Sequence, residues 1–227
     1  MAKIDFNGIK GKIKNAADSV KDKVSEQKSK FEKTKELPEK VTPPAAISTR
    51  NAMKIMYYLI AADGVVKPEE EEKFDYIGAE ASPEYESFRD AIIEECKKQL
   101  EKVIDDEDLF DVLRDGVENE LLTSVQTEDT YITPKLLIWN MISVAYSDGE
   151  YSDIERRLIK AVVRRLEIDK AVLSEMENSF SALIDLEKEL EWIKTTDRPY
   201  LTVETMVNEI SDRKNAIYEN VKDLISL

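Results

Sequence analysis

The residues of this chain that could do chemistry are carboxylates that occur twice in the same arrangement. An Asp-Gly pair is followed, seven residues after the aspartate, by a glutamate. The arrangement is repeated at an offset of 85 residues, with Asp63, Gly64 and Glu70 in the first copy and Asp148, Gly149 and Glu155 in the second. In both copies an apolar segment of helical periodicity precedes the Asp-Gly pair, and a second helical segment follows it. Each copy therefore predicts a helical hairpin with carboxylates gathered at its turn.

Paired carboxylates can act as a general acid and a general base. That role requires a carboxyl group whose pKa is raised in an apolar cleft, whereas corners on an acidic surface are well hydrated. A hydrolase is therefore the least favoured function class. The chain also contains no histidine, which excludes a Ser-His-Asp triad and a histidine-ligated zinc site.

The composition is typical of an all-α protein. There are only 6 glycines and 7 prolines in 227 residues, and 36% of the residues are charged, so the turn residues of a large β fold are lacking. The single cysteine, Cys96, excludes an intrachain disulfide and fits a reducing cytoplasm. No apolar run is long enough to span a membrane and no secretory signal is recognisable. The net charge of −15 argues against a nucleic-acid partner.

The charge is distributed unevenly along the chain. Residues 1–40 contain eleven lysines and seven acidic residues, a net charge of +4, and removing this from −15 leaves −19 for the rest. Prolines 38, 43 and 44 are incompatible with a continuous helix there. We therefore predict two parts: residues 1–44, a lysine-rich amphipathic helix with a proline-rich linker, and residues 45–227, an all-helical domain.

Three interpretations of the amphipathic segment stay open. It docks as a helix on a partner or on the chain's own domain, or it remains a disordered charged tail because its apolar stripe is thin. In the third interpretation residues 1–36 make peripheral contact with an anionic membrane surface. The sequence does not determine the oligomeric state.

Start and stop signals define the helices of the domain. Thr133 before Pro134 is a helix start, Ser152 and Glu155 have the spacing of a capping box, and the glycines after the two aspartates are expected to be left-handed. The expected helices lie near residues 47–62, 68–80, 84–103, 107–125, 134–146, 153–166, 169–194 and 202–226.

Some side chains on the apolar stripes have two interpretations. Core packing is the preferred one for the two tryptophans, while Cys96 is expected to be half-buried in its helix. The tyrosines near the Asp-Gly corners could instead line a surface groove, although core packing is again preferred. The residues in question are Trp139, Trp192, Tyr57, Tyr58 and Tyr146.

The segment from Asp148 to Glu155, after an apolar helix, resembles the signature of the TerB tellurite-resistance family and of the related N-terminal domain of DjlA-type co-chaperones. The resemblance covers residues 48–195. It implies an all-helical fold of two similar halves, here about 48–80 and 134–166. It also implies a cytoplasmic module linked to stress responses that acts near membrane partners.

The resemblance further implies that a divalent metal binds the acidic motif residues. The matching residues are Asp63, Glu70, Asp148 and Glu155, and the neighbours Glu150 and Asp153 could add oxygens. Oxygen ligands select a hard cation, Ca²⁺ or Mg²⁺, and not zinc. In the competing interpretation these acids are structural, since aspartates close turns and glutamates near a helix start bind its free amides.

The function predicted from the sequence is therefore a non-enzymatic binding or scaffold module of the TerB type, with a protein as its partner. The alternative is a divalent-metal sensor or buffer whose acidic corners switch partner binding when they are occupied.

Overall fold

The computed structural model describes residues 43–104, 106–123 and 130–226. The amphipathic segment predicted over residues 1–36 lies outside the described residues. Within these ranges the chain forms eight helices and one two-stranded sheet, which confirms the all-α prediction. In chain order they are β1 (Ile47–Ser48), α2 (Thr49–Ile60), α3 (Pro68–Ala81), α4 (Tyr85–Leu100), α5 (Asp106–Leu122), β2 (Tyr131–Ile132), α6 (Pro134–Ala145), α7 (Asp153–Arg165), α8 (Lys170–Lys194) and α9 (Tyr200–Ser226).

Helices α2 and α6 form the centre of the body. Each is apolar on nearly all of its faces, and a helix of that kind is stable only when it is surrounded by protein. Helix α2 packs against α3, α4, α5 and α6, while α6 also packs against α7 and α8. Met53, Met56, Leu137 and Met141 are fully buried at this centre. The first helix of each repeated hairpin is therefore a central element of the core.

A short antiparallel sheet joins the starts of these two helices. Ile47 pairs with Ile132, and each strand leads directly into a helix. Ser48 Oγ accepts a hydrogen bond from Asn51 N at 3.2 Å, and Thr133 Oγ1 accepts one from Leu136 N at 3.3 Å. Each hydroxyl satisfies a free amide of the first helical turn. The predicted helix start at Thr133 is confirmed, whereas the sheet was not expected.

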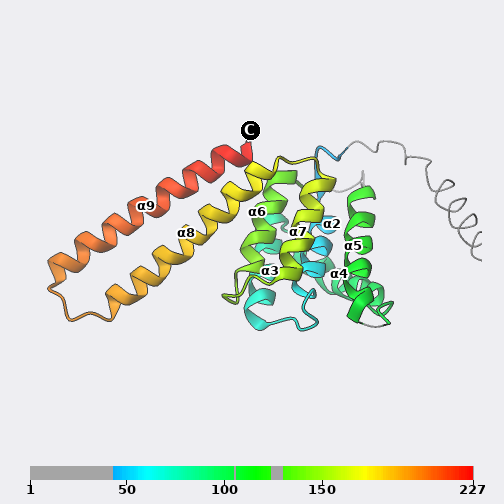
Figure 1. Cartoon of the computed structure of the whole chain (residues 1–227), viewed down its shortest axis with the longest axis horizontal. Coiled ribbons are helices and arrows are strands. Elements are labelled where there is room, and N and C mark those ends of the chain that lie inside the picture. The colour runs from blue at the N-terminus through cyan, green and yellow to red at the C-terminus, as the bar shows by residue number, and fades with distance from the viewer. Residues whose placement is uncertain (1–42, 105, 124–129, 227) are drawn as a thin grey trace, which may run out of the picture. The chain divides into compact units, whose positions relative to one another are not determined.

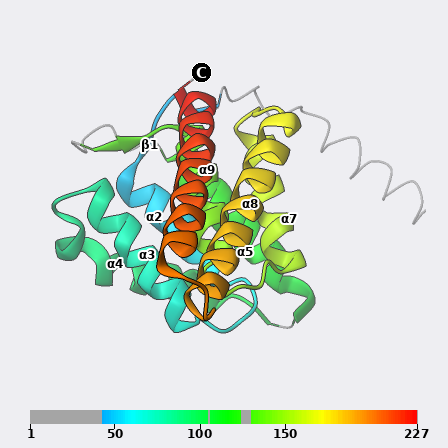
Figure 2. The same cartoon turned by 90° about the vertical axis from the view of Figure 1, so that its left-hand side faces the viewer.

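The last two helices form a long antiparallel hairpin that extends away from the other helices of residues 43–227 (Figure 1). Figure 2 shows α8 and α9 side by side when the hairpin faces the viewer. Leu186, Ile193 and Ile210 form a small second core between them. At the base of the hairpin, Lys135 Nζ donates to the carbonyl oxygen of Leu224 at 3.1 Å.

The burial predictions for Trp192 and Cys96 were wrong. Trp192 is 53% exposed near the far end of the hairpin, where its ring stacks on the Arg198 guanidinium at 5.0 Å instead of entering a core. Cys96 is fully buried, and its thiol donates to the carbonyl oxygen of Lys54 at 3.8 Å. The part of the chain that the structure describes contains no helix with both the length and the apolarity needed to cross a bilayer.

Burial makes Cys96 a probe of unfolding. Burial raises the pKa of its thiol to about 12, so both access and thiolate formation are suppressed in the folded state. We expect a disulfide reagent such as DTNB to label the folded chain at least about 10³-fold more slowly than the unfolded chain. Labelling followed by absorbance at increasing urea concentration measures this ratio. A folded protein that is labelled as fast as the unfolded chain would contradict the burial of Cys96.

Candidate functional site

The two Asp-Gly corners have the same local geometry. Gly64 and Gly149 both have a φ of 86°, the left-handed conformation that ends each preceding helix. Asp63 Oδ1 accepts a hydrogen bond from Val65 N at 3.0 Å, and Asp148 Oδ1 accepts one from Glu150 N at 2.8 Å. The predicted equivalence of the two corners is therefore confirmed down to the individual hydrogen bond.

Both motif glutamates fold back on the start of their own helix. Glu155 Oε2 accepts from Ser152 N at 2.8 Å and from Ser152 Oγ at 2.7 Å, which completes the predicted capping box. Glu70 Oε2 accepts from Lys67 N at 2.9 Å, without a hydroxyl to help. Glu70 is 2% exposed and Glu155 is 4% exposed. The structural role given to these two acids is thus observed.

The two corners meet through a lysine. The Lys67 ammonium forms an ion pair with Asp148 of the other copy, and it lies 3.5 Å from Asp63 Oδ2 and 3.8 Å from Glu150 Oε2. The Asp148 side chain is only 6% exposed, whereas that of Glu150 is 83% exposed. Asp153 is exposed in the first turn of α7, where its charge favours the helix dipole. Five of the six predicted ligands thus belong to the paired corners or their caps.

The electrostatics show how closely these acids interact. Burial raises the pKa of Glu70 to about 7. The hydrogen bond from Lys67 N lowers this pKa, whereas repulsion from Glu155, Asp63 and Asp148 raises it further. Burial also raises the pKa of Glu155, against the hydrogen bonds from Ser152. Burial opposes ionisation of Asp148, but hydrogen bonds from Lys67 and Glu150 N leave the pKa of Asp148 below its usual value.

The donor set as it is placed does not fit a divalent cation. Among residues 43–104, 106–123 and 130–226, no group of three acidic or cysteine side chains is arranged to hold a metal ion. The ammonium of Lys67 lies at the point where the carboxylates of the two copies approach each other. One observation is in favour of a cation, because Glu155 Oε1 is buried without a hydrogen-bond partner. The predicted metal site therefore stays a prediction.

The comparisons with known proteins agree with this geometry. The family model described as tellurite resistance protein TerB matches residues 49–178. This chain belongs to the TerB family. No curated protein and no solved structure matches it significantly. The TerB match contains both corners and ends within α8, so the outer part of α8 and all of α9 lie beyond the matched residues.

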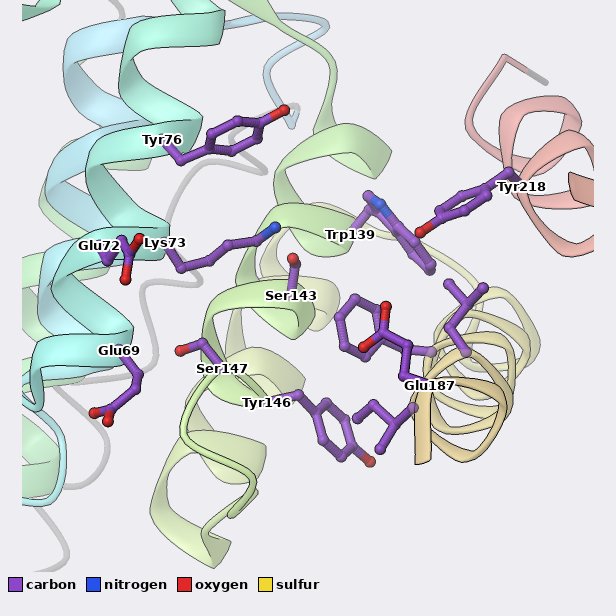
Figure 3. A pocket seen from close by; sticks show the side chains of 13 residues that line it. Glu69, Glu72, Lys73, Tyr76, Trp139, Ser143, Tyr146, Ser147, Glu187 and Tyr218 are labelled. Atoms are coloured by element: carbon purple, nitrogen blue, oxygen red, sulfur yellow. The ribbon is translucent and has the colours of Figure 1, made fainter. Parts of the chain in front are cut away.

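A cleft lies between the body of the TerB match and the α8–α9 hairpin. Its volume is about 510 Å³, and α3, α6, α8 and α9 line it. Figure 3 shows Glu69, Glu72, Lys73 and Tyr76 on one wall, Trp139 on α6 with Tyr146 directly after its end, and Glu187 and Tyr218 on the hairpin. The lining residues on the hairpin, from Phe180 onward, all lie beyond the TerB match.

The cleft was missed by the sequence analysis, apart from one tyrosine. Tyr146 does line it, with its ring stacked on Phe180 at 5.3 Å, while Tyr57 and Tyr58 are buried in the core as preferred. Trp139 is partly buried and packs edge-on against Phe180 at 5.3 Å. The apolar pattern of α8 indicated a buried face, but it could not indicate that α9 would leave a cleft open beside α6.

The raised pKa of Glu70 predicts a pH-dependent stability. Because the folded pKa of about 7 exceeds the ordinary 4.5, the folded state retains a proton between these pH values that the unfolded state has lost. The stability linked to this group is complete below about pH 4.5 and falls as the pH rises through 7. We expect Glu70→Gln to be more stable than the wild type by about 1–2 kcal/mol above pH 7, and equal to it near pH 4.5.

Urea denaturation at a series of pH values tests this expectation. The glutamine keeps an oxygen that can accept from Lys67 N, so the comparison isolates the charge. Glu69→Gln, at the exposed neighbouring position, is the control and should show no such change with pH. A difference between wild type and Glu70→Gln that stays constant from pH 4.5 to pH 8 would contradict the prediction.

Proposed function

We propose that this protein is a non-enzymatic scaffold of the TerB type that binds a basic amphipathic helix of a protein partner in the cleft beside the hairpin. The cleft between α3, α6 and the α8–α9 hairpin is the observation that carries the proposal. It combines an aromatic surface with exposed carboxylates. Amphipathic helices bind apolar grooves of this kind through their apolar face, and basic side chains on such a helix would face the carboxylates.

The aromatic side chains supply the contact surface. Tyr76 is 55% exposed on α3 and Tyr218 is 47% exposed on α9, at opposite sides of the cleft (Figure 3). Trp139 on α6 and Tyr146 directly after α6 also line the cleft. Large aromatic rings that are partly exposed and held on rigid helices are typical of the centre of an interface, because they bury much area at little cost in conformational entropy.

The charges select a basic partner. Glu69 and Glu72 are exposed on the α3 wall, whereas Glu187 on the opposite wall is already paired with Lys214 at 3.0 Å. Lys73, the basic residue of the cleft, lies 5.2 Å from the Tyr76 ring. Residues 41–227 carry a net charge of −19, so the wider field attracts cations and repels phosphate. Lysine or arginine side chains flanking an apolar stripe complement this arrangement.

Anisotropy of a fluorescent model peptide tests the proposal. The probe is an amphipathic helix of leucine and lysine, with a glutamate analogue and a scrambled lysine peptide as controls. We expect the lysine helix alone to bind, and the double variant Glu72→Lys/Tyr76→Ala to weaken binding at least about tenfold. Glu86→Lys, an exposed site on α4 outside the cleft, is the matched control and should bind like the wild type. Equal binding by both variants, or no binding by the wild type, would overturn the proposal.

We also propose a cytoplasmic location and a role without catalysis. The single cysteine and the TerB membership support a cytoplasmic place. The corner acids are engaged in turns, caps and an ion pair, which supports a role without catalysis. Membrane contact through residues 1–36 stays a prediction.

The alternative of a divalent-metal sensor also stays a prediction. The unpartnered Glu155 Oε1 favours it, because a buried carboxylate oxygen gains from a nearby cation. The position of the Lys67 ammonium beside Asp148 opposes it. Calorimetry with Ca²⁺ and Mg²⁺ distinguishes a metal sensor from a scaffold that binds no metal.

A further inference from the structure

We infer that the ammonium of Lys67 takes the place of a divalent cation at the paired corners, so that this chain joins its two repeat halves without a metal ion. The inference is independent of the cleft. It starts from an asymmetry between the repeats, because the position of Lys67 in the first copy corresponds to Ser152 in the second.

The lysine connects the two copies directly. It stands at the start of α3 in the first copy, and its ammonium is paired with Asp148, the corner aspartate of the second. Its own corner aspartate, Asp63, is 3.5 Å away, and Glu150 of the second copy is 3.8 Å away. An ammonium has three N–H donors, and here three carboxylates surround it. The hydrogen bond with Asp148, together with the charges of Asp148, Asp63 and Glu70, raises the pKa of Lys67 above its ordinary value, so it stays protonated.

The same geometry places a positive charge where a metal ion would bind. Ca²⁺ requires six to eight oxygens at about 2.3–2.6 Å, and Mg²⁺ requires an octahedron at about 2.0–2.1 Å. A cation placed among Asp63, Asp148 and Glu150 would meet the Lys67 ammonium, which has the same sign of charge. The lysine therefore supplies the positive charge that a metal would supply, and its side chain excludes the metal from that position.

Ser152, at the equivalent position of the second copy, shows which contacts a serine makes in place of the lysine. Ser152 Oγ donates to Glu155 of its own helix at 2.7 Å and so reaches no corner aspartate. A serine at position 67 could make the same bond to Glu70. Asp63, Asp148 and Glu150 would then be left without the ammonium, and the unpartnered Glu155 Oε1 lies in the cap of the adjoining α7. We expect Lys67→Ser to acquire affinity for hard divalent cations.

Titration calorimetry of the full-length protein with CaCl₂ and MgCl₂ tests the inference. The wild type should show no saturable heat up to about 1 mM metal, a range in which weak protein calcium sites bind. Lys67→Ser should bind at least about tenfold more tightly than the wild type. Lys67→Arg, which keeps the positive charge, should behave like the wild type, and Lys73→Ser controls for the loss of a lysine elsewhere on α3.

Thermal denaturation adds a readout that does not depend on heats of binding. Lys67→Ser should melt at a lower temperature than Lys73→Ser in the presence of EDTA, and it alone should recover when Ca²⁺ or Mg²⁺ is added. Saturable binding of either metal by the wild type overturns the inference, and this measurement needs no variant to fold. A Lys67→Ser protein that folds, binds neither metal and melts like Lys73→Ser overturns it as well.

Discussion

Gly78→Ala is expected to lower the free energy of unfolding by about 1–3 kcal/mol, although alanine normally stabilises the interior of a helix by about 1 kcal/mol relative to glycine. The reason is steric. A Cβ atom at position 78 would lie 2.3 Å from Cε2 of Tyr85, a ring that is 1% exposed. Glycine is required within α3 because the first turn of α4 packs directly on its backbone.

The Tyr85 ring cannot move away to make room. Phe74 packs edge-on against it with a centroid distance of 6.1 Å, and Phe88 does so at 5.7 Å. Its hydroxyl donates to Asp75 Oδ1 at 2.7 Å, which ties the ring at its far end. A close-packed interior transmits such an overlap into shifts of its neighbours, and those shifts carry the cost.

Chemical denaturation followed by circular dichroism measures the effect, and a double-mutant cycle identifies its cause. In a Tyr85→Leu background the smaller side chain removes the ring that the new Cβ would overlap, so Gly78→Ala should cost less than about 1 kcal/mol there. Ala79→Gly, at an exposed neighbouring position in α3, should lose only the usual helix propensity of about 1 kcal/mol. A neutral or stabilising Gly78→Ala would show that α3 and α4 are not packed as described.

Most of the helices could be predicted because their ends are chemically marked. Pro68 and Pro134 start α3 and α6 at the predicted residues. The two left-handed glycines end the preceding apolar segments as expected. These signals are local, since a cap or a fixed φ acts within one turn, and a single sequence contains them in full.

Features that depend on distant residues could not be predicted in this way. The pairing of Ile47 with Ile132 joins segments that lie far apart in the chain, and neither strand is long enough to show an alternating pattern. Trp192 lies on an apolar stripe, but the stripe does not reveal where the partner helix α9 begins. The exposed ring at the hairpin end was therefore assigned to the core.

In the candidate site, too, the local contacts could be predicted from the sequence, whereas the contact between the two hairpins could not. The turn bonds of Asp63 and Asp148 and the back-bonding of Glu155 follow from spacing alone. The contact of Lys67 with Asp148 does not, because it depends on how the two hairpins are packed together. From the sequence, Lys67 is only the residue that occupies the place of the capping serine Ser152, and its contact with the second copy is a property of the tertiary structure.

Reversing the charge at this contact should have the second large effect. Lys67→Glu is expected to lower the urea concentration at the midpoint of unfolding at low salt, because it breaks the ion pair with Asp148. The effect should be smaller than for a fully buried pair, since the Lys67 side chain is 32% exposed and water screens its charge. The substitution removes the partner of Asp148, whose side chain is 6% exposed, and adds a carboxylate beside it.

Urea denaturation at two ionic strengths distinguishes this repulsion from a general effect of one more negative charge. Lys73→Glu changes the net charge of the same helix equally, but it removes only a contact of 5.2 Å with the Tyr76 ring, worth about 0.5–1 kcal/mol. In 1 M salt, where the screening length is about 3 Å, the deficit of Lys67→Glu should shrink towards that of Lys73→Glu. Equal deficits at low salt would mean that Lys67 does not hold the two corners together. A deficit of Lys67→Glu that is unchanged by salt would place its cause in packing and not in charge.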